Sequence, residues 1–401
     1  MKVLLVTWAC DLDDVSEPFV AATWARQLAG EHEVTLFSVS RPDRFGCVQA
    51  QFPDLEVFEW VDVAVPGSLE RFRAVVNPGY FRYVRKARRF IKYLLTKREF
   101  DVIHHLSPFS WRYPSPATDL GVPLVRGPVA GGLQTPAGLK EALPQGPAWM
   151  RLRGVDQARL RWDPRLRHNI RDVDHLLLAA PYVQDILAQV GDLPPSSVES
   201  EWGLEPQDLP AVRTRGPGQP PIFLYSGRII PSKGLRFALR GLAAAQSRDA
   251  RLRVVGDGDD RPGCERLVAE LGLSDRVSFD GWVSPAEVRR AYEASDVLLF
   301  PSVREPSGGV VLEAMSHSMP VITAAAGGPA AMVSDDCGFR VTTASPDATI
   351  REIAAAIDLL VSDPELISRM GARGRERAEQ LFAWPAKLQR VNDIYRAVAQ
   401  A

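Results

Sequence analysis

Short apolar runs alternate with stretches of helical periodicity along most of this chain, and this alternation constrains its fold more than any other feature. The run VLLVT, from Val3, is followed by a helical pattern over Pro18–Ala29 and then by a second run, EVTLFSV. A strand, a helix and a second strand in this order form a βαβ unit with parallel strands. The runs DVIHHL, from Asp101, and VPLVRGPV continue the pattern. The first half of the chain is therefore predicted to be one doubly wound α/β domain.

The alternation starts again after PQDLPAVRTRGPGQPP, a stretch rich in proline and glycine over Pro206–Pro221. We interpret this stretch as a linker because it has no periodicity. Beyond it, the predicted strands are PIFLYSG, RLRVVGDGDD, RVSFDGWV, DVLLFPS and PVITA. A chain of 401 residues is long enough for two such domains. We expect an N-terminal domain over 1–205, a C-terminal domain over 206–385 and a last helix over 386–401 that packs on the N-terminal domain.

Composition argues against several classes of protein. The 48 basic and 49 acidic side chains give a formal net charge of -1, so nothing in the global charge points to a nucleic-acid partner. The four cysteines have no C-x-x-C spacing, which argues against a zinc site and a disulfide framework. We find neither a signal-peptide core nor an apolar run of about 18 residues. We therefore expect a cytoplasmic protein.

The segment Asp296–Pro329, DVLLFPSVREPSGGVVLEAMSHSMPVITAAAGGP, carries the most informative chemistry. Its first residues form a predicted buried strand, so Glu305 lies beyond the carboxyl end, where open α/β sheets bind ligands. Gly308 and Gly309 then begin a helix, whose N-terminal N–H groups can approach a diphosphate. Glu313 follows about one turn later. Both carboxylates can accept hydrogen bonds from hydroxyl groups, Glu305 from a transferred sugar and Glu313 from a ribose. This arrangement suits a nucleotide sugar.

The segment resembles the signature of the family-4 retaining glycosyltransferases, in which seven residues separate two glutamates. The alternative is a chance loop with two solvated glutamates, and the surrounding residues argue against it. The resemblance implies an α/β protein of GT-B fold, with two Rossmann-like domains facing across an interdomain cleft. It covers nearly the whole second half with specific motifs, and the first half only in strand order. It also implies no metal and no cofactor, with a nucleotide diphosphate sugar as co-substrate.

The second motif is FLYSGRIIPSKGL, from Phe223 to Leu235. In the family, this pattern places an arginine and a lysine on the diphosphate of the donor, here Arg228 and Lys233. A leaving diphosphate gains negative charge as the glycosidic bond breaks, and fixed cations stabilise that charge. We therefore predict three catalytic residues: Arg228, Lys233 and Glu305, the last as an orienter of the sugar.

The segments VVGDGDD and VSFDGWV resemble the family's Gly-x-Gly turn and the strand end that reads the base. Asp257, Asp259 and Asp260 could suggest a metal site, but a turn also favours such residues, and the resemblance implies metal-independent chemistry. Ser307 replaces the family's usual phenylalanine near the sugar. The predicted donor-binding residues are Gly227, Gly256, Gly281, Trp282, Val283, Ser307, Gly308, Gly309, Val310 and Glu313.

The acceptor side departs from the family pattern. Ser16 and Glu17 stand where the family has a glycine pair, and Ser16 is alternatively a helix N-cap. Arg126 stands where many relatives have a histidine. His105 ends another predicted strand, at a position that the family also uses, although a packed histidine explains it equally well. The predicted acceptor-side candidates are Ser16, Glu17, His105, Arg126, Gly131 and Gly132.

Residues 82–98 form a predicted amphipathic helix with one basic face, which contains Arg82, Arg85, Lys86, Arg89 and Lys92. This face could dock on anionic lipid at the inner face of a membrane or hold a phosphorylated acceptor. The alternative is a core-packed helix with a solvated basic face. The sequence leaves these alternatives open.

The leading hypothesis is a retaining, metal-independent transfer of a hexosyl unit to an acceptor hydroxyl. UDP-sugar is the favoured donor and GDP-sugar the second choice, and the acceptor is a small molecule, a lipid-linked molecule or a polysaccharide. By resemblance, the leaving group departs on the front face through an oxocarbenium-like state. The alternatives are a hydrolase, epimerase or phosphorylase on the same scaffold, and a nucleotide-sugar binding protein without catalysis. The sequence leaves open the sugar, the base, the acceptor and the oligomeric state.

Overall fold

The computed structural model describes residues 1–40, 47–61, 78–143, 153–211 and 219–400, which form two compact units. The first unit contains residues 1–132, 148–201 and 385–401, and the second contains residues 133–147 and 202–384. Compared with the boundaries expected from the sequence, the second unit starts at 202 and also includes the segment 133–147. Residues 212–218 of the expected linker lie outside the described residues.

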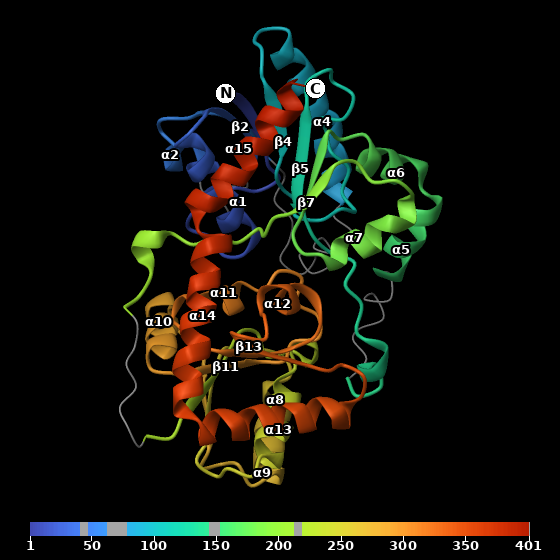
Figure 1. The fold of residues 1–401 in the computed structure, drawn as a ribbon. Helices are drawn as coiled ribbons and strands as arrows, with labels where there is room; N and C mark the ends of the chain where they lie inside the picture. The colour runs from blue at the N-terminus through green and yellow to red at the C-terminus, as the bar shows by residue number, and fades with distance from the viewer. Residues whose placement is uncertain (41–46, 62–77, 144–152, 212–218, 401) are drawn as a thin grey trace. The chain divides into compact units, whose positions relative to one another are not determined.

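The first unit is built on a parallel sheet with the strand order β3-β2-β1-β4-β5-β6-β7 (Figure 1). The order reverses between β1 and β4, which creates a switch point at the carboxyl ends of these two strands. Leu4, Leu5 and Val6 in β1 are fully buried, as expected for a parallel strand that is covered on both faces. The strands are β1 (Lys2–Val6), β2 (Glu33–Ser40), β3 (Glu56–Val61), β4 (Val102–His105), β5 (Leu124–Val129), β6 (His175–Leu178) and β7 (Ser196–Val198).

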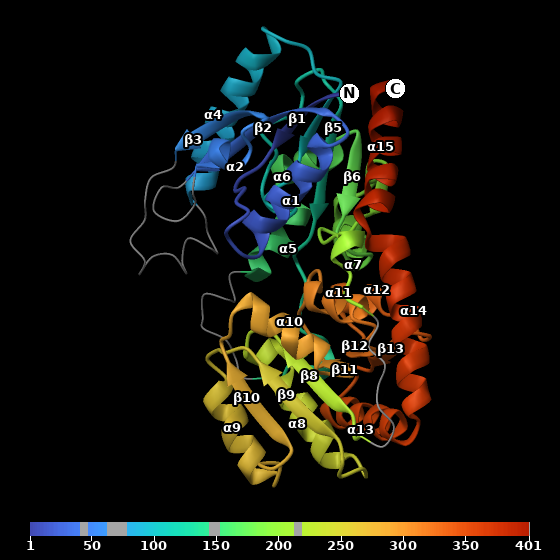
Figure 2. The same ribbon diagram turned by 90° about the vertical axis from the view of Figure 1, so that its left-hand side faces the viewer.

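Helices connect and cover this sheet. They are α1 (Glu17–Ala29), α2 (Val48–Gln51), α4 (Pro78–Leu95), α5 (Arg153–Trp162), α6 (Pro164–Arg171), α7 (Tyr182–Leu187) and α15 (Trp384–Gln400). Figures 1 and 2 show α15, in red, running along the first unit to the C-terminus.

Buried polar contacts hold α15 to the first unit. Lys387 is completely buried, and its Nζ donates to Glu199 Oε1 at 2.6 Å. Burial lowers the pKa of Lys387, and the negative charge of Glu199 opposes this effect. Further along α15, the Tyr395 hydroxyl lies 2.6 Å from Nδ1 of His104. Burial also lowers the pKa of His104 to about 4, so its imidazole is neutral at pH 7 and accepts this hydrogen bond.

The second unit repeats the plan with the strand order β10-β9-β8-β11-β12-β13, and its switch point lies between β8 and β11. Its strands are β8 (Ile222–Ser226), β9 (Arg251–Val255), β10 (Val277–Gly281), β11 (Val297–Phe300), β12 (Val321–Ala324) and β13 (Gly338–Val341). The predicted α/β architecture of two Rossmann-like domains is confirmed.

Helices cover both faces of the second sheet. Figure 2 shows α8 and α9 on one face and α10, α11 and α12 on the other. The helices are α8 (Leu235–Ala244), α9 (Arg261–Glu270), α10 (Pro285–Glu293), α11 (Gly309–Ser316), α12 (Gly327–Met332), α13 (Pro346–Ser362) and α14 (Pro364–Phe382).

We expect Glu199→Gln to destabilise the first unit by about 3 kcal/mol or more, because the buried ammonium group of Lys387 loses its counterion. For a unit of about 200 residues, this change corresponds to a fall in Tm of roughly 6 °C or more. Thermal unfolding followed by circular dichroism measures it.

Asp393→Asn is the matched control, because it removes a carboxylate from α15, the helix that carries Lys387. Asp393 pairs with Arg396, and the two side chains are 60% and 62% exposed. An exposed pair contributes at most about 1 kcal/mol. Equal Tm values for the two variants would contradict the anchoring role of Glu199.

Candidate active site

Two loops meet at the switch point of the second unit, one after β8 and one after β11. The loop after β8 contains the short 3-10 turn Pro231–Lys233 and then Gly234, whose φ is 78°. A Cβ atom on Gly234 would lie 2.1 Å from the carbonyl oxygen of Pro301, in the loop after β11. Val303 N donates to Ser232 O at 3.0 Å across the same contact. Only glycine at position 234 allows the two loops to pack this closely.

This contact brings Lys233 to Glu305. The Nζ atom of Lys233 donates to Glu305 Oε2, and the two side chains are 16% and 15% exposed. The other oxygen of Glu305 accepts a hydrogen bond of 3.4 Å from the backbone N–H of Gly308. Gly308 is the N-cap of α11 and has a φ of 86°, so the helix begins at the predicted glycine pair. The carboxylate of Glu305 thus occupies a position that favours an anion, between a cation and a helix N-terminus.

The loop that carries Glu305 is supported by a second glycine pair, which the sequence analysis did not single out. Gly328 N donates to Glu305 O at 2.9 Å. A Cβ atom on Gly327 would lie 2.2 Å from that oxygen, and one on Gly328 would lie 2.5 Å from Ser307 O. The only local signal of this support is the pair of glycines after the apolar run PVITA.

Arg228 lies two residues beyond the end of β8 and is exposed. Within the described residues, no side chain pairs with its guanidinium group, while its carbonyl oxygen accepts a hydrogen bond of 3.2 Å from the Tyr225 hydroxyl. Arg228 therefore leaves its five N–H donors available for a ligand at this edge of the sheet.

Gly256 has a packing role. A Cβ atom on Gly256 would lie 2.0 Å from Gly227 O, so the loop after β9 rests against the loop after β8. The backbone N–H of Gly256 donates to Gly281 O at 2.9 Å, which joins the end of β10 to the same set of loops. Trp282, the next residue after Gly281, is 74% exposed and is accessible to a ligand. Val283 is half-buried beside it.

The acidic turn after β9 is neutralised by arginines. Asp260 accepts hydrogen bonds from Arg236, and Asp257 pairs with Arg261 at 3.2 Å. In the described ranges, no group of three or more histidine, cysteine, aspartate or glutamate side chains is arranged to hold a metal ion. Metal independence stays a prediction.

Glu313 lies on α11 with part of its side chain exposed to solvent, whereas its carboxyl group is surrounded by protein atoms. Desolvation by the surrounding protein raises its pKa, and a hydrogen bond from Tyr292 opposes this effect. The Tyr292 hydroxyl also lies within hydrogen-bond distance of Val310 O, at 3.3 Å. Tyr292 therefore supports the first turns of α11 from within the core.

In the first unit, Ser16 and Glu17 lie at the start of α1. Ser16 occupies the N-cap position with a φ of 62°, but its side chain makes no capping hydrogen bond. Glu17 instead reaches the loop after β4, where Oε1 accepts a hydrogen bond of 3.0 Å from Phe109 N. Desolvation raises the pKa of Glu17, and this backbone hydrogen bond lowers it. Both residues thus lie near the switch point of the first sheet.

Arg126 and His105 are buried in the first unit. The guanidinium group of Arg126 donates to Asn169 O at 2.8 Å and Trp111 O at 3.0 Å, and burial lowers the pKa of Arg126 to about 10. Burial also holds the pKa of His105 well below its usual range, so its imidazole is neutral. The donors of Arg126 are occupied by backbone carbonyls, so the structure gives it a packing role. Contact of either residue with an acceptor stays a prediction.

Gly131 and Gly132 lie just beyond β5, with φ values of 100° and 76°. A Cβ atom on Gly132 would lie 3.0 Å from the ring of Trp111. The pair therefore allows the backbone to pack against this buried indole.

Comparison with known proteins gives a family match within the second unit. Residues 212–377 match the family described as glycosyl transferases group 1. The D-inositol 3-phosphate glycosyltransferase of Streptomyces griseus is 33% identical over 240 residues, which cover 56% of this chain and 50% of that protein. The alpha-D-kanosaminyltransferase of Streptomyces kanamyceticus is 27% identical over 244 residues, which cover 58% of this chain and 62% of that protein. The chain thus spans between half and two thirds of the length of these relatives.

Solved structures match the whole chain in fold. The apo form of the lipopolysaccharide outer core galactosyltransferase WaaB superposes with a TM-score of 0.70 at 18% identity, over 99% of both chains. Anabaena Alr3699/HepE in complex with UDP and glucose gives a TM-score of 0.65 at 17% identity, over 99% of this chain and 100% of that one. At these identities the likeness establishes the fold alone. Over residues 212–377 the chain is therefore similar to the glycosyl transferases of group 1, and its fold is GT-B.

Proposed function

We propose that this protein is a retaining, metal-independent glycosyltransferase that moves a hexosyl unit from a nucleotide diphosphate sugar to an acceptor hydroxyl. The observation that carries the proposal is the meeting of Lys233 with Glu305 at the N-terminus of α11, close in sequence to the exposed Arg228. These groups supply the positive charge that a leaving diphosphate requires. UDP-sugar is the first choice of donor, which the complex of the fold relative HepE with UDP-glucose supports.

Each group has a separate task in this proposal. Arg228 and Lys233 stabilise the charge on the leaving diphosphate, together with the N–H groups at the start of α11. Glu305 orients the transferred sugar, and Glu313 accepts hydrogen bonds from the ribose. The exposed Trp282 and its neighbours Gly281 and Val283 lie at the end of β10, where backbone groups can read the base. Because two fixed cations and a helix N-terminus supply the positive charge, the proposal includes no divalent metal.

In this proposal, the carboxylate of Glu305 and the diphosphate of the nucleotide sugar compete for the same groups. The carboxylate contacts Lys233 and the N–H of Gly308, and we assign both of these groups to binding of the nucleotide sugar. When the nucleotide sugar binds, its diphosphate replaces the carboxylate of Glu305 at these two groups. The exchange frees Glu305 to accept hydrogen bonds from sugar hydroxyl groups.

The names of two relatives suggest an acceptor class. One is the D-inositol 3-phosphate glycosyltransferase and another is the 2-deoxystreptamine glucosyltransferase of Streptomyces kanamyceticus. We propose a hydroxyl-bearing small molecule of this kind as the acceptor, with a lipid-linked molecule or a polysaccharide as further choices.

We also propose that α4 contacts an anionic membrane surface. Tyr80, Tyr83, Ala87 and Ile91 bury its apolar stripe in the core, which leaves the basic face exposed. Phe81 and Tyr93 are 50% and 59% exposed beside that face. In the part of the chain that the structure describes, no helix is long and apolar enough to cross a membrane.

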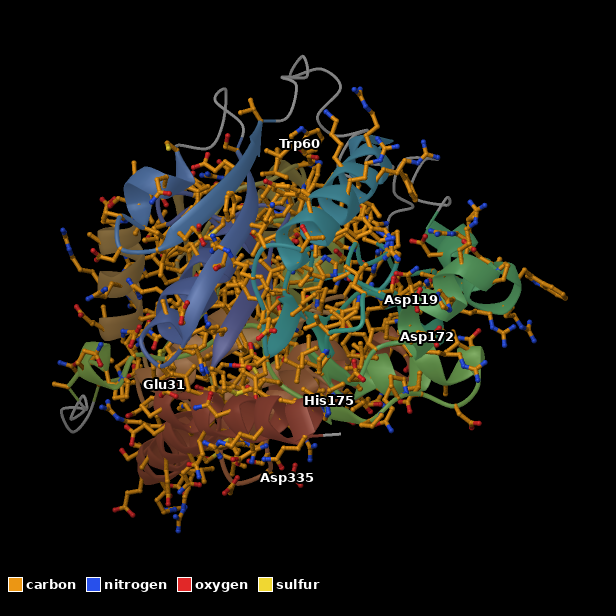
Figure 3. All side chains as sticks on the ribbon, turned by 90° about the horizontal axis from the view of Figure 1, so that it is seen from above. Glu31, Trp60, Asp119, Asp172, His175 and Asp335 are labelled. Carbon is orange, nitrogen blue, oxygen red and sulfur yellow. The ribbon has the colours of Figure 1, made fainter. Side chains whose placement is uncertain are left out.

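The charges of α4 and α6 differ in their partners. On α6, His168 pairs with both Asp119 and Asp172, which lie next to one another in Figure 3. On α4, the five exposed cations have no carboxylate partner among the described residues, and Lys86 lies 5.0 Å from the ring centroid of Trp60. The unpaired charge of α4 favours an anionic surface.

The first experiment is a thermal-shift screen in EDTA with UDP-, GDP-, ADP- and dTDP-sugars. A donor at a hundred times its Kd stabilises the protein by roughly 2.7 kcal/mol. We expect UDP-sugars to raise Tm. A shift that requires a divalent metal would overturn metal independence, and no shift with any nucleotide sugar would contradict the donor site.

With the donor and acceptor that give product, we expect Arg228→Ala and Lys233→Ala each to lower kcat on the order of 10²-fold or more, because charge stabilisation is lost. Release of nucleoside diphosphate measures the rate, and proton NMR of the product shows the anomeric configuration. Arg240→Ala on α8 is the control, because Arg240 is an exposed cation of the same unit. Near-normal kcat in both site variants would remove them from the diphosphate site, and product without any acceptor would favour a hydrolase.

We expect Glu305→Gln to bind UDP about three- to tenfold more tightly, because the internal anion that competes for Lys233 is weakened. The same variant should turn over more slowly, because the sugar loses its orienting carboxylate. Isothermal calorimetry with UDP measures the affinity. Glu365→Gln neutralises a side chain of the same unit that is 92% exposed, and it should leave the Kd unchanged. Weaker UDP binding by Glu305→Gln would contradict the exchange of anions.

We expect the protein to sediment with vesicles that contain phosphatidylserine and not with neutral vesicles. Each basic residue near the surface contributes about 1 kcal/mol. The variant Arg85→Ala/Lys86→Ala/Arg89→Ala should therefore stay in the supernatant, whereas the control Arg165→Ala/Arg171→Ala on α6 should still sediment. Equal sedimentation of all three proteins would show that α4 does not dock.

A further inference from the structure

Trp202 is the first residue of the second unit's main segment and touches the loop that carries the proposed donor groups. Its indole Nε1 donates to Ser307 Oγ at 3.1 Å. A Cβ atom on Gly309 would lie 2.8 Å from Cε2 of the same ring. The indole therefore contacts both residues that flank Gly308, the N-cap of α11.

The small residues Ser307 and Gly309 leave space for the indole of Trp202, and Ser307 also accepts its hydrogen bond. Ser307 is buried and offers its hydroxyl oxygen as the acceptor for the indole N–H. Gly309 begins α11 with an ordinary backbone conformation, since its φ is not among the positive values of the chain. The absence of a side chain at position 309 is thus explained by the ring of Trp202 and not by backbone strain.

The backbone around Trp202 is fixed within the second unit. Leu204 N donates to Phe382 O at 2.9 Å, and Trp384 N donates to Leu204 O at 2.9 Å. Gly203 packs on Trp384 so closely that a Cβ atom would lie 2.6 Å from its ring. The indole of Trp202 is therefore presented to the donor loop by a fixed backbone.

We propose that Trp202 is a positioning residue of the donor site. It holds Ser307 and Gly309, and through them the N–H groups at the start of α11, in the arrangement that binds a diphosphate. This proposal rests on the proposed function and adds a residue to its site that acts through others.

The first test removes the hydrogen bond from either side. Trp202→Phe keeps an aromatic ring without the N–H donor, and Ser307→Ala removes the acceptor. Each should raise the Kd for UDP roughly three- to tenfold, the range of one hydrogen bond. The double variant should be no weaker than either single variant, because both remove the same interaction. Fully additive effects would overturn the proposal.

The second test changes the close contact between position 309 and the indole ring of Trp202. Gly309→Ala should raise the Kd for UDP by about tenfold or more, because the new methyl group meets the indole. Trp202→Leu/Gly309→Ala should recover part of that loss. The control is Gly374→Ala, a helical position of the same unit where the nearest atom to a Cβ would lie 3.5 Å away. No recovery in the double variant would overturn the proposal.

The outcomes separate this proposal from the proposed function. If the wild-type protein binds UDP and all Trp202, Ser307 and Gly309 variants bind it equally well, the positioning role is overturned and the donor site stands. If the wild-type protein binds no nucleotide, the proposed function fails and this inference fails with it. Melting curves without UDP show whether each variant is folded.

Discussion

The ion pair between Lys233 and Glu305 joins the two loops that flank the switch point of the second sheet, and the candidate site depends on it. The pair places a cation, a carboxylate and a helix N-terminus within reach of one another. Charges in this arrangement require few rearrangements when an anionic ligand arrives, because the protein already holds opposite charges at short range. The carboxylate of Glu305 also limits the cost of placing the partly buried cation of Lys233 at this edge of the sheet.

Close backbone contacts make this ion pair possible. At Gly234, Gly256 and Gly327 a Cβ atom would lie about 2 Å from a carbonyl oxygen of a neighbouring loop. The loops at the carboxyl edge therefore touch through their backbones and exchange hydrogen bonds. The sheet holds these loops in place, so the backbone atoms from which the side chains of the site extend have fixed positions.

Much of the second unit could be predicted because its signals are local. Gly308 and Gly309 begin a helix as expected, and Arg228 and Glu305 follow strands as expected. The first unit was less predictable at the level of single residues. The guanidinium group of Arg126 lies among backbone carbonyls, and the ring of His105 lies beside the Tyr80 hydroxyl. A strand pattern shows that a residue is near a sheet edge, but it does not show whether its polar atoms find partners in the core.

The sequence by itself determined the alternation of strands and helices, the start of α11 and the charged residues at the strand ends, because each of these follows from neighbouring residues. Only the tertiary structure decided which of these groups meet. Glu305 pairs with a lysine 72 residues away, and Ser307 accepts a hydrogen bond from a tryptophan 105 residues away. Such contacts depend on strand order and on the packing of loops across the sheet, and the local pattern of residues encodes neither.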